Sequence, residues 1–581
     1  MEARNRSLPQ WFERIRTRQM SLPRFQRLEA WGPREVANLL TTILRGLPAG
    51  ATLILEVGDQ LPFVHRAMVG APTEGERITE LLLDGQQRLT AIWRALTDDY
   101  PDHTYLVFFE DDEALGLTNV PTVYGQRRWS KNGQRFPQWA DDPEQLWSRG
   151  YIPARLLRPG DVEDEVDAWI DRISGADLQE ARRIGRIIAG LRANVARFNL
   201  PFLSLPVGTP KEVALDVFIK MNTSSVPLST FDVIVAQLEA ETGQSLRDLV
   251  DALHGEVPDA AEYQPLEEWV LETAALMQGK PPNQTGYWAL DLNRVVDEWD
   301  QLVEGVRGAV GLLGEEGVFD AARLPTDAPL GVVAALWPDL PTQPDALGNA
   351  RVTLRRYLWR SFLTTRYDRA AATGSFADFK ALSAFLKGEG SDTDVPIFNE
   401  AVHPLPTEEE LLMAGWPKNR GILPRGMLAL ATRAGARDIA DDARASRAHV
   451  RQREYHHLFP QALLRLADVK ERDVFRALNC ALITWRTNRS ISSKEPITYL
   501  RERARANTLG ERDLAERLRS HLVPYEALAV GGYDQMSSEQ RVEAIVRDYD
   551  AFVKHRARVV RAAIQQVAAG RHLDLQEAFS A

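Results

Sequence analysis

The segment from Ile78 to Trp93 restricts the fold of this chain more than any other feature. An apolar run, Ile78–Leu83, ends in the polar turn Asp84–Arg88, and an apolar helical pattern follows from Leu89. A strand that leads into a helix through a glycine-containing turn is typical of α/β domains. Strand-like and helix-like runs alternate in this way over about the first 240 residues. We therefore expect an α/β N-terminal domain.

The expected elements follow from apolar spacing and from breaks at glycine and proline. Strands are predicted at 51–57, 78–83, 105–109 and 202–207, and helices at 36–44, 89–96, 161–198, 211–221 and 538–570. The stretch 246–440 has mainly helical spacing, and Gly388–Pro406, which is acidic and poor in apolar residues, is the best linker candidate. A length of 581 residues is too great for one hydrophobic core. We predict three domains, at 1–245, 246–440 and 441–581.

The turn Asp84-Gly85-Gln86-Gln87-Arg88 lies between a strand and a helix, where proteins commonly bind phosphates. Gly85 allows close backbone approach, Arg88 can pair with phosphate oxygens, and Asp84 can hold a metal or polarise a water. Gln86 and Gln87 can donate to phosphate or orient that water. The alternative is a structural turn in which Asp84 caps the helix and Arg88 forms a surface ion pair. A P-loop NTPase is excluded, because no G-x-x-x-x-G-K-[ST] occurs.

A second group of candidate residues begins with the adjacent histidines His456 and His457. On a strand such neighbours point to opposite faces, so one imidazole can bind a metal while the other faces a water. Asn479 and Asn488 follow nine residues apart. The alternative is an ordinary histidine pair, with one ring packed and the other exposed.

Charge and cysteine content restrict the function classes. The net charge is -11, but residues 1–46 carry +5 and residues 441–520 carry +6, which leaves -22 for the remainder. The total argues against a polybasic nucleic-acid binder, whereas the two basic segments are compatible with DNA contact or with solvated helices. Because Cys480 is the single cysteine, the chain has no disulfide framework and no Cys-rich zinc module. We expect a cytoplasmic protein without a signal peptide or a membrane span.

Three motifs resemble the DGQQR-motif domain of GmrSD-type restriction enzymes, which is related to the ParB/sulfiredoxin-like fold. They are LPRFQR at 22–27, LLLDGQQRLTAIW at 81–93 and VFIKMNTSSVPLSTFDVI at 217–234. The resemblance implies nucleotide binding and hydrolysis centred on Asp84, Gln86, Gln87 and Arg88. It also implies that Asn222 and Asp232 shape the same pocket. The structural alternatives are a turn at Asn222 and a helix cap at Asp232.

Two further motifs resemble the HNH nuclease domain, a ββα-metal fold that accompanies the DGQQR domain in these enzymes: YHHLFP at 455–460 and LNCALITWRTNRSISSKEPITYL at 478–500. The resemblance implies that His457 is the general base and that His456 and Asn488 bind Mg²⁺ or Mn²⁺. It implies that Asn479 fixes the loop and that Lys494 contacts the phosphate or the leaving oxygen, with a surface lysine as the alternative. Many HNH enzymes have histidine at the position of Asn488. An amide oxygen binds metal less tightly, which puts the metal preference in doubt.

Taken together, the motifs resemble modification-dependent DNA endonucleases of the GmrSD type, including SspE-like and BrxU-like enzymes, which act in bacterial defence against phage. The resemblance implies that the N-terminal domain binds and hydrolyses an NTP (GTP, ATP or UTP) and senses modified cytosine or phosphorothioate in double-stranded DNA. Phe25, Gln26 and Arg27 are the candidate sensing residues, and the C-terminal domain would nick or cleave. A homodimer is a further possible assembly, which the sequence does not decide. The alternatives are a nucleotide-gated ParB-like DNA-binding protein without nuclease activity and an RNA-cleaving HNH toxin.

Overall fold

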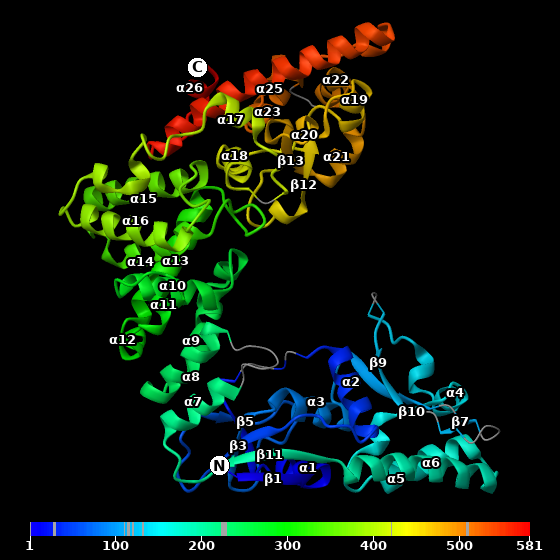
Figure 1. Cartoon of the computed structure of the whole chain (residues 1–581). Helices are drawn as coiled ribbons and strands as arrows, with labels where there is room; N and C mark the ends of the chain where they lie inside the picture. Colours follow the sequence, from blue (N-terminus) through cyan, green and yellow to red (C-terminus); the bar gives the residue numbers. More distant parts are fainter. Residues whose placement is uncertain are drawn as a thin grey trace. The chain divides into compact units, whose positions relative to one another are not determined.

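The computed structural model describes residues 2–26, 29, 31–109, 111–112, 117–118, 121–130, 133–221, 229–419, 421–506 and 510–580. The chain divides into two compact units, Met1–Arg247 and Asp248–Ala581 (Figure 1). The first unit is a mixed α/β structure and the second is rich in helices, as the sequence predicts. The finer expectations, a ParB/sulfiredoxin-like fold, an HNH domain and three separate domains, stay predictions.

The first unit is built on a six-stranded sheet with the order β1-β11-β3-β5-β2-β4. The strands are β1 (Glu2–Ser7), β2 (Met20–Pro23), β3 (Thr52–Glu56), β4 (His65–Arg66), β5 (Glu80–Asp84) and β11 (Asn199–Leu205). β11 is parallel to β3 and β5 is parallel to β2, whereas the other neighbours are antiparallel. The sheet is therefore mixed, and β5 lies inside it with a neighbour on each side.

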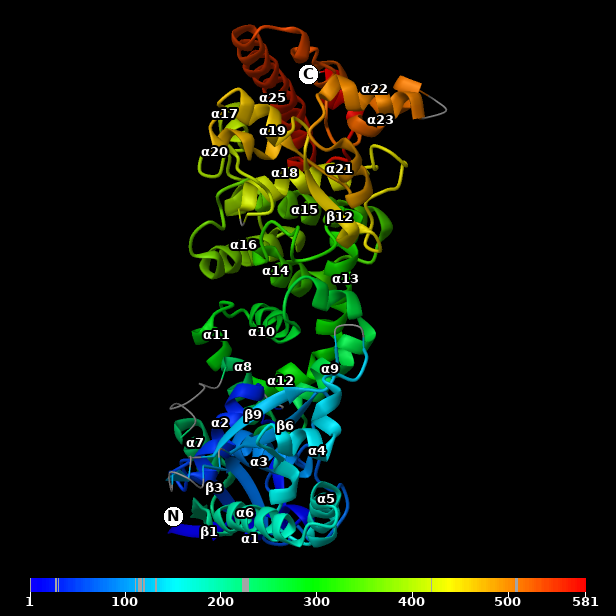
Figure 2. The ribbon, with the colours of Figure 1, turned by 90° about the vertical axis from the view of Figure 1, so that its right-hand side faces the viewer.

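Helices complete the core of the first unit. They are α1 (Leu8–Arg16), α2 (Pro33–Leu44), α3 (Gln86–Thr97), α4 (Pro143–Ser148), α5 (Glu163–Ser174), α6 (Leu178–Arg197), α7 (Lys211–Met221) and α8 (Thr230–Thr242). A smaller sheet, β10-β6-β9, contains Tyr151–Pro153, His103–Phe108 and Thr122–Arg127, and a short pair joins β7 (Asp111–Asp112) to β8 (Leu117–Thr118). Helices α5 and α6 lie side by side (Figure 2). Trp11, Leu40, Leu82 and Ile92 share one apolar core.

The turn after β5 forms as the sequence predicts, but the helix begins three residues earlier than its apolar pattern. Leu81, Leu82 and Leu83 are almost completely buried, because an inner strand is covered on both faces. Gly85 has a φ of +94°, and a Cβ at this position would lie 2.4 Å from the Thr52 Cγ2 atom. Glycine is thus required twice here, by its backbone conformation and by the close approach of β3.

The second unit begins with a helical region. Its helices are α9 (Leu246–Glu256, which starts at the end of the first unit), α10 (Leu266–Met277), α11 (Gln284–Trp288), α12 (Leu292–Asp297), α13 (Trp299–Glu315), α14 (Ala328–Leu336), α15 (Pro344–Leu363), α16 (Ala371–Leu386), α17 (Glu408–Met413) and α18 (Ile422–Arg433). The prediction of a linker at 388–406 is wrong, because Val395 and Ile397 are fully buried. The buried Arg360 guanidinium of α15 also donates to the backbone carbonyls of Ile397 and His403.

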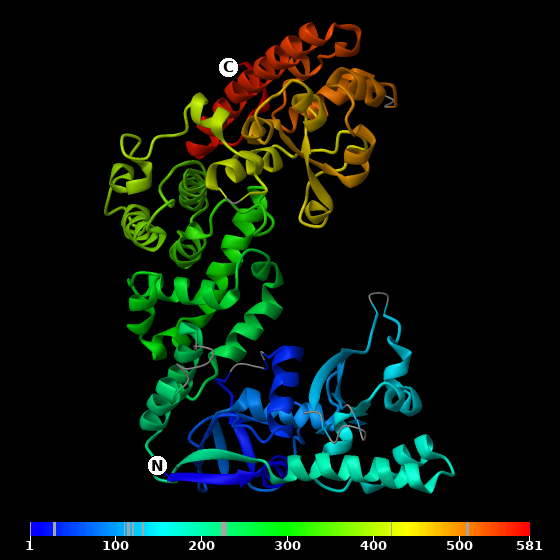
Figure 3. The same ribbon diagram turned by 45° about the vertical axis from the view of Figure 1, so that its right-hand side comes forward.

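The remainder of this unit contains one hairpin among helices. The strands are β12 (Arg453–His457) and β13 (Cys480–Thr484), and the helices are α19 (Gln461–Leu466), α20 (Glu471–Val474), α21 (Trp485–Ile491), α22 (Pro496–Ala506), α23 (Gly510–Arg519), α24 (Tyr525–Leu528), α25 (Ser538–Ala568) and α26 (Leu575–Ser580). The long helix α25, predicted at 538–570, lies alongside the hairpin region (Figure 3). Its buried Arg556 donates to the carbonyls of Leu478 and Cys480 and so fixes the start of β13. Within the described ranges, no helix is long and apolar enough to cross a membrane.

Candidate functional site

The hairpin and the helix after it form a ββα arrangement. β12 and β13 are antiparallel, with His456 opposite Ala481 and His457 opposite Cys480, and α21 begins directly after β13. The buried Asp438 carboxylate accepts hydrogen bonds from the Thr484 amide at 2.6 Å and from the Thr487 hydroxyl at 2.5 Å. Burial raises the pKa of Asp438, but these hydrogen bonds outweigh it and lower the pKa overall. Asp438 thus anchors the N-terminus of α21 as a carboxylate.

Three polar side chains converge between β12 and α21. The His456 Nδ1 atom lies 2.7 Å from the Asn488 Oδ1 atom, and the Asn488 amide nitrogen donates to the Glu454 carboxylate, also at 2.7 Å. Glu454 and His456 are two residues apart on one strand, so they share a face. His456 is buried, whereas Glu454 is exposed, so the group opens to solvent on the Glu454 side.

Glu454 is a member of this group that sequence reasoning missed. The available signal was its spacing, because a residue two positions before His456 on a strand must lie on the same face. A carboxylate oxygen, an imidazole nitrogen and an amide oxygen are together a suitable donor set for Mg²⁺ or Mn²⁺. Among the described residues no group of three or more His, Cys, Asp or Glu side chains could hold a metal, so a set of three protein ligands here would include the amide of Asn488.

His457 points to the opposite face of β12. Its ring stacks on the Trp416 indole, with centroids 4.1 Å apart and planes 14° apart, and Phe475 meets it edge-on at 4.9 Å. Burial is the main cause that lowers the pKa of both His456 and His457 to about 4. Both rings are therefore neutral at neutral pH, the form in which an imidazole can bind a metal or accept a proton. The His457 Nε2 atom is buried, without a hydrogen-bond partner in the described part of the chain.

Asn479 and Lys494 lie in contrasting surroundings. Asn479 is fully buried, where its side chain accepts from the Phe459 amide at 2.8 Å and donates to the carbonyls of Phe459 and Val474 at 3.1 Å. These hydrogen bonds link the segment after β12 to the residues directly before β13. Lys494 is partly exposed and forms an ion pair with Glu502 at 2.6 Å. This is the arrangement expected of a surface lysine, the alternative to a phosphate contact.

The turn in the first unit contains the ion pair of its structural interpretation, but the N-cap of α3 is Gly85 and not Asp84. Arg88 pairs with Asp84 at 3.2 Å and also donates to the Ala49 carbonyl at 3.1 Å. Burial raises the pKa of Asp84, against the opposing effects of Arg88 and the Gly85 amide. Gln86 is buried at the first position of α3, and Gln87 follows it.

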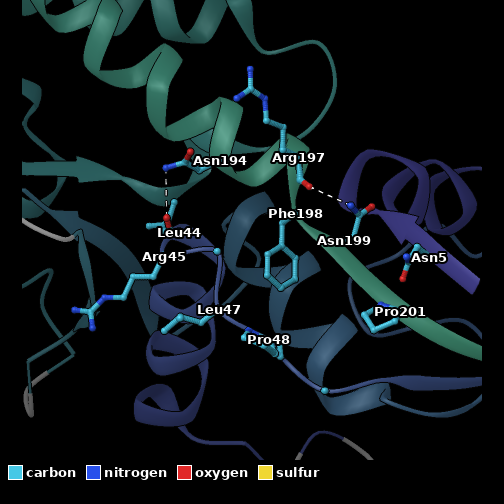
Figure 4. Close-up of a pocket in the computed structure, with 13 residues that line it drawn as sticks. Asn5, Leu44, Arg45, Leu47, Pro48, Asn194, Arg197, Phe198, Asn199 and Pro201 are labelled. Carbon is cyan, nitrogen blue, oxygen red and sulfur yellow. Dashed lines mark hydrogen bonds between the residues drawn. The ribbon is translucent and has the colours of Figure 1, made fainter.

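A cleft of about 710 Å³ is lined by the segment 44–50 together with residues of β1, α6 and β11 (Figure 4). Its lining includes Ala49 and Gly50, the backbone that contacts the Arg88 guanidinium. In Figure 4 the Phe198 ring lies at the centre near Leu47 and Pro48, whereas the Arg45 and Arg197 side chains extend away from it. A cleft of this size is within the range that holds small ligands.

Phe25, Gln26 and Asp232 are held by contacts within the first unit. Phe25 is buried against Phe63 and Phe218, and the Gln26 amide donates to the carbonyls of Leu82 and Leu83 in β5. Asp232 forms a capping box with Ser229 at the start of α8 and pairs with Arg247 at 2.9 Å, so the cap expected as its structural alternative is present. Arg27 and Asn222 lie outside the described residues.

Comparison with known proteins identifies the first unit. Residues 8–239 match the family model described as the N-terminal domain of the GmrSD restriction endonuclease. The match lies within the first unit and does not extend into the second. This match confirms the resemblance of the N-terminal motifs to that domain. The match ends before the hairpin.

The chain is also similar to an uncharacterised protein of Methanocaldococcus jannaschii. The two are 20% identical over 521 residues, which cover 83% of this chain and 84% of that protein. Because the first unit ends at Arg247, a similarity of this length extends into the second unit.

Proposed function

We propose that this protein is an NTP-regulated, modification-dependent DNA endonuclease whose second unit hydrolyses phosphodiesters by HNH-type chemistry. The observation that carries the proposal is the convergence of Glu454, His456 and Asn488 between a β-hairpin and its following helix. The family match supports DNA as the substrate. The basic excess of residues 441–520 is the charge that a DNA-binding nuclease needs.

Glu454, His456 and Asn488 would hold the divalent cation. Two oxygen donors and one imidazole suit Mg²⁺ or Mn²⁺ better than zinc, which prefers cysteine and histidine in closed sites. A bound cation would neutralise the charge that develops on the leaving 3′ oxygen. The hydrogen bond from His456 Nδ1–H to the Asn488 Oδ1 atom keeps the two side chains together, and it would have to open for these two atoms to bind the cation.

His457 is the proposed base, which takes a proton from the attacking water. Its low pKa keeps the imidazole neutral over the physiological range. Asn479 positions it indirectly, because it fixes the segment that follows β12. Asp438 positions Asn488 in the same way through α21.

The first unit is the proposed regulator. The turn Asp84–Arg88, with its αL glycine at a helix start, is suited to phosphate, and the neighbouring cleft is large enough for a nucleoside. Gln26 is the better supported sensing residue, because its Oε1 atom is buried without a partner in the described chain. Phe25 would have to be uncovered before it could touch DNA, since it is 1% exposed.

The test is nicking of a supercoiled plasmid by the full-length protein with Mg²⁺ or Mn²⁺. Unmodified, glucosylated and phosphorothioated plasmids are compared, each with and without GTP, ATP or UTP. We expect cleavage that depends on the cation and is lost in His456→Ala, His457→Ala and Asn488→Ala. Nicking that survives in all three variants would refute the assigned site. Nucleotide-dependent DNA binding without any cleavage would favour a ParB-like DNA-binding protein.

A further inference from the structure

The surroundings of His457 differ from those that a working general base requires. A base must reach the proton it removes through a hydrogen bond to water or substrate. Here one face of the ring is covered by Trp416 and one edge by Phe475, and the Nε2 atom is shielded from solvent without a partner in the described residues. His457 as a whole is partly exposed, so the covered parts are this ring face, this edge and the Nε2 atom.

The cover comes from a different part of the chain than the hairpin. Trp416 lies between α17 and α18, in a segment, 414–419, that contains no regular helix or strand. A backbone hydrogen bond from Ala477 to the Ala414 carbonyl, 2.9 Å long, holds the start of this segment. Trp416 is 6% exposed and its ring lies against Tyr455, His457 and Phe475, so ring contacts and burial hold the side chain in place.

The contact between Trp416 and His457 has a stacking part, and burial of Trp416 against Leu428, Cys480 and Leu482 adds to it. Aromatic stacking of this kind changes an equilibrium by about 2- to 10-fold beyond the effect of area burial. Gly415, which precedes Trp416, is exposed, and a Cβ added there would meet no atom within 4 Å. Gly415 therefore faces open space, whereas β13 is held at its two ends by Arg556 and Asp438.

We propose that Trp416 is an autoinhibitory cover on His457, and that the nuclease becomes active when the 414–419 segment moves away. This inference rests on the proposed role of His457 as the base. Removal of the indole exposes the Nε2 atom and raises the basal rate of DNA nicking. Regulation of the enzyme then acts, at least in part, on the position of this segment.

The test measures exposure and activity separately, in the full-length protein. Exposure is the rate at which diethyl pyrocarbonate modifies His457, read by fragment-ion mass spectrometry that distinguishes it from His456. Activity is plasmid nicking with Mn²⁺. The variants are Trp416→Ala, Trp416→Phe, which retains a stacking ring, and Leu428→Ala. Leu428 belongs to the same apolar cluster as Trp416, so it controls for loss of packing.

We expect Trp416→Ala to raise both rates by at least about 2- to 10-fold, the range set by the lost stacking. Trp416→Phe and Leu428→Ala should stay near the wild type. Unchanged His457 modification in Trp416→Ala, or an equal rise in Leu428→Ala, would overturn the proposal. Faster modification with slower nicking would also overturn it, because Trp416 would then assist catalysis. Faster modification of His457 in Trp416→Ala, with no nicking by any of the proteins including the wild type, would support the cover and refute the nuclease function.

Discussion

Replacement of His521 by glutamine should make the second unit less sensitive to acid. The His521 side chain is fully buried, its Nε2–H donates to the Arg437 carbonyl at 2.6 Å, and its Nδ1 atom has no partner in the described residues. Burial, assisted by Arg556 and Arg453, lowers the pKa from 6.5 to about 4. Protonation would place a charge and an unpaired N–H in the core, so the folded unit holds the ring neutral.

The sign and the size of the pH effect on the free energy of unfolding follow from the different proton affinities of His521 in the folded and unfolded chain. The unfolded chain binds this proton more tightly, so stability falls as the pH drops from about 6.5 towards 4. With these two pKa values, the free energy of unfolding at about pH 5 is lower than at pH 7.5 by about 2 kcal/mol for this one group. His456 and His457 act in the same direction, so the wild type loses more than this.

The assay is urea unfolding of the full-length protein at about pH 5 and pH 7.5, with the transition of the second unit followed by circular dichroism. Glutamine can retain the hydrogen bond to Arg437 but does not titrate. His521→Gln should therefore reduce the loss of stability between the two pH values by about 2 kcal/mol. His254→Gln, which removes an exposed histidine, is the control. An equal acid sensitivity of His521→Gln and the wild type would refute the reasoning.

Three further predictions concern the candidate sites. Glu454→Gln should raise the Mn²⁺ concentration for half-maximal nicking by about 10-fold or more, with recovery at high Mn²⁺; an unchanged metal dependence would remove Glu454 from the ligand set. Gly85→Ala should cost about 1–3 kcal/mol of stability in thermal melts, because of its φ of +94° and the contact with Thr52, and Thr52→Ser should restore part of the loss. Asn479→Ala leaves three buried backbone groups unpaired and should cost about 3 kcal/mol or more in urea titrations; a loss below about 1 kcal/mol would contradict its bridging role.

The sequence by itself determined the local elements. The apolar run before Asp84 had to be a buried strand, and the glycine after it required a turn into a helix, because both follow from spacing and steric freedom over a few residues. The long C-terminal helix was predicted at 538–570 for the same reason. The family motifs named the residues on which the candidate sites are built, including His456 and Asn488.

Only the tertiary structure decided which side chains meet. Glu454 joins His456 because α21 packs on one face of the hairpin and brings Asn488 to it, and Trp416 reaches His457 across about 40 residues of chain because the other face needs an apolar cover. The segment 388–406 has the composition of a linker but is packed, since Val395 and Ile397 find a core. Local patterns set the period of a strand or helix, whereas partners across elements depend on burial that only the complete fold provides.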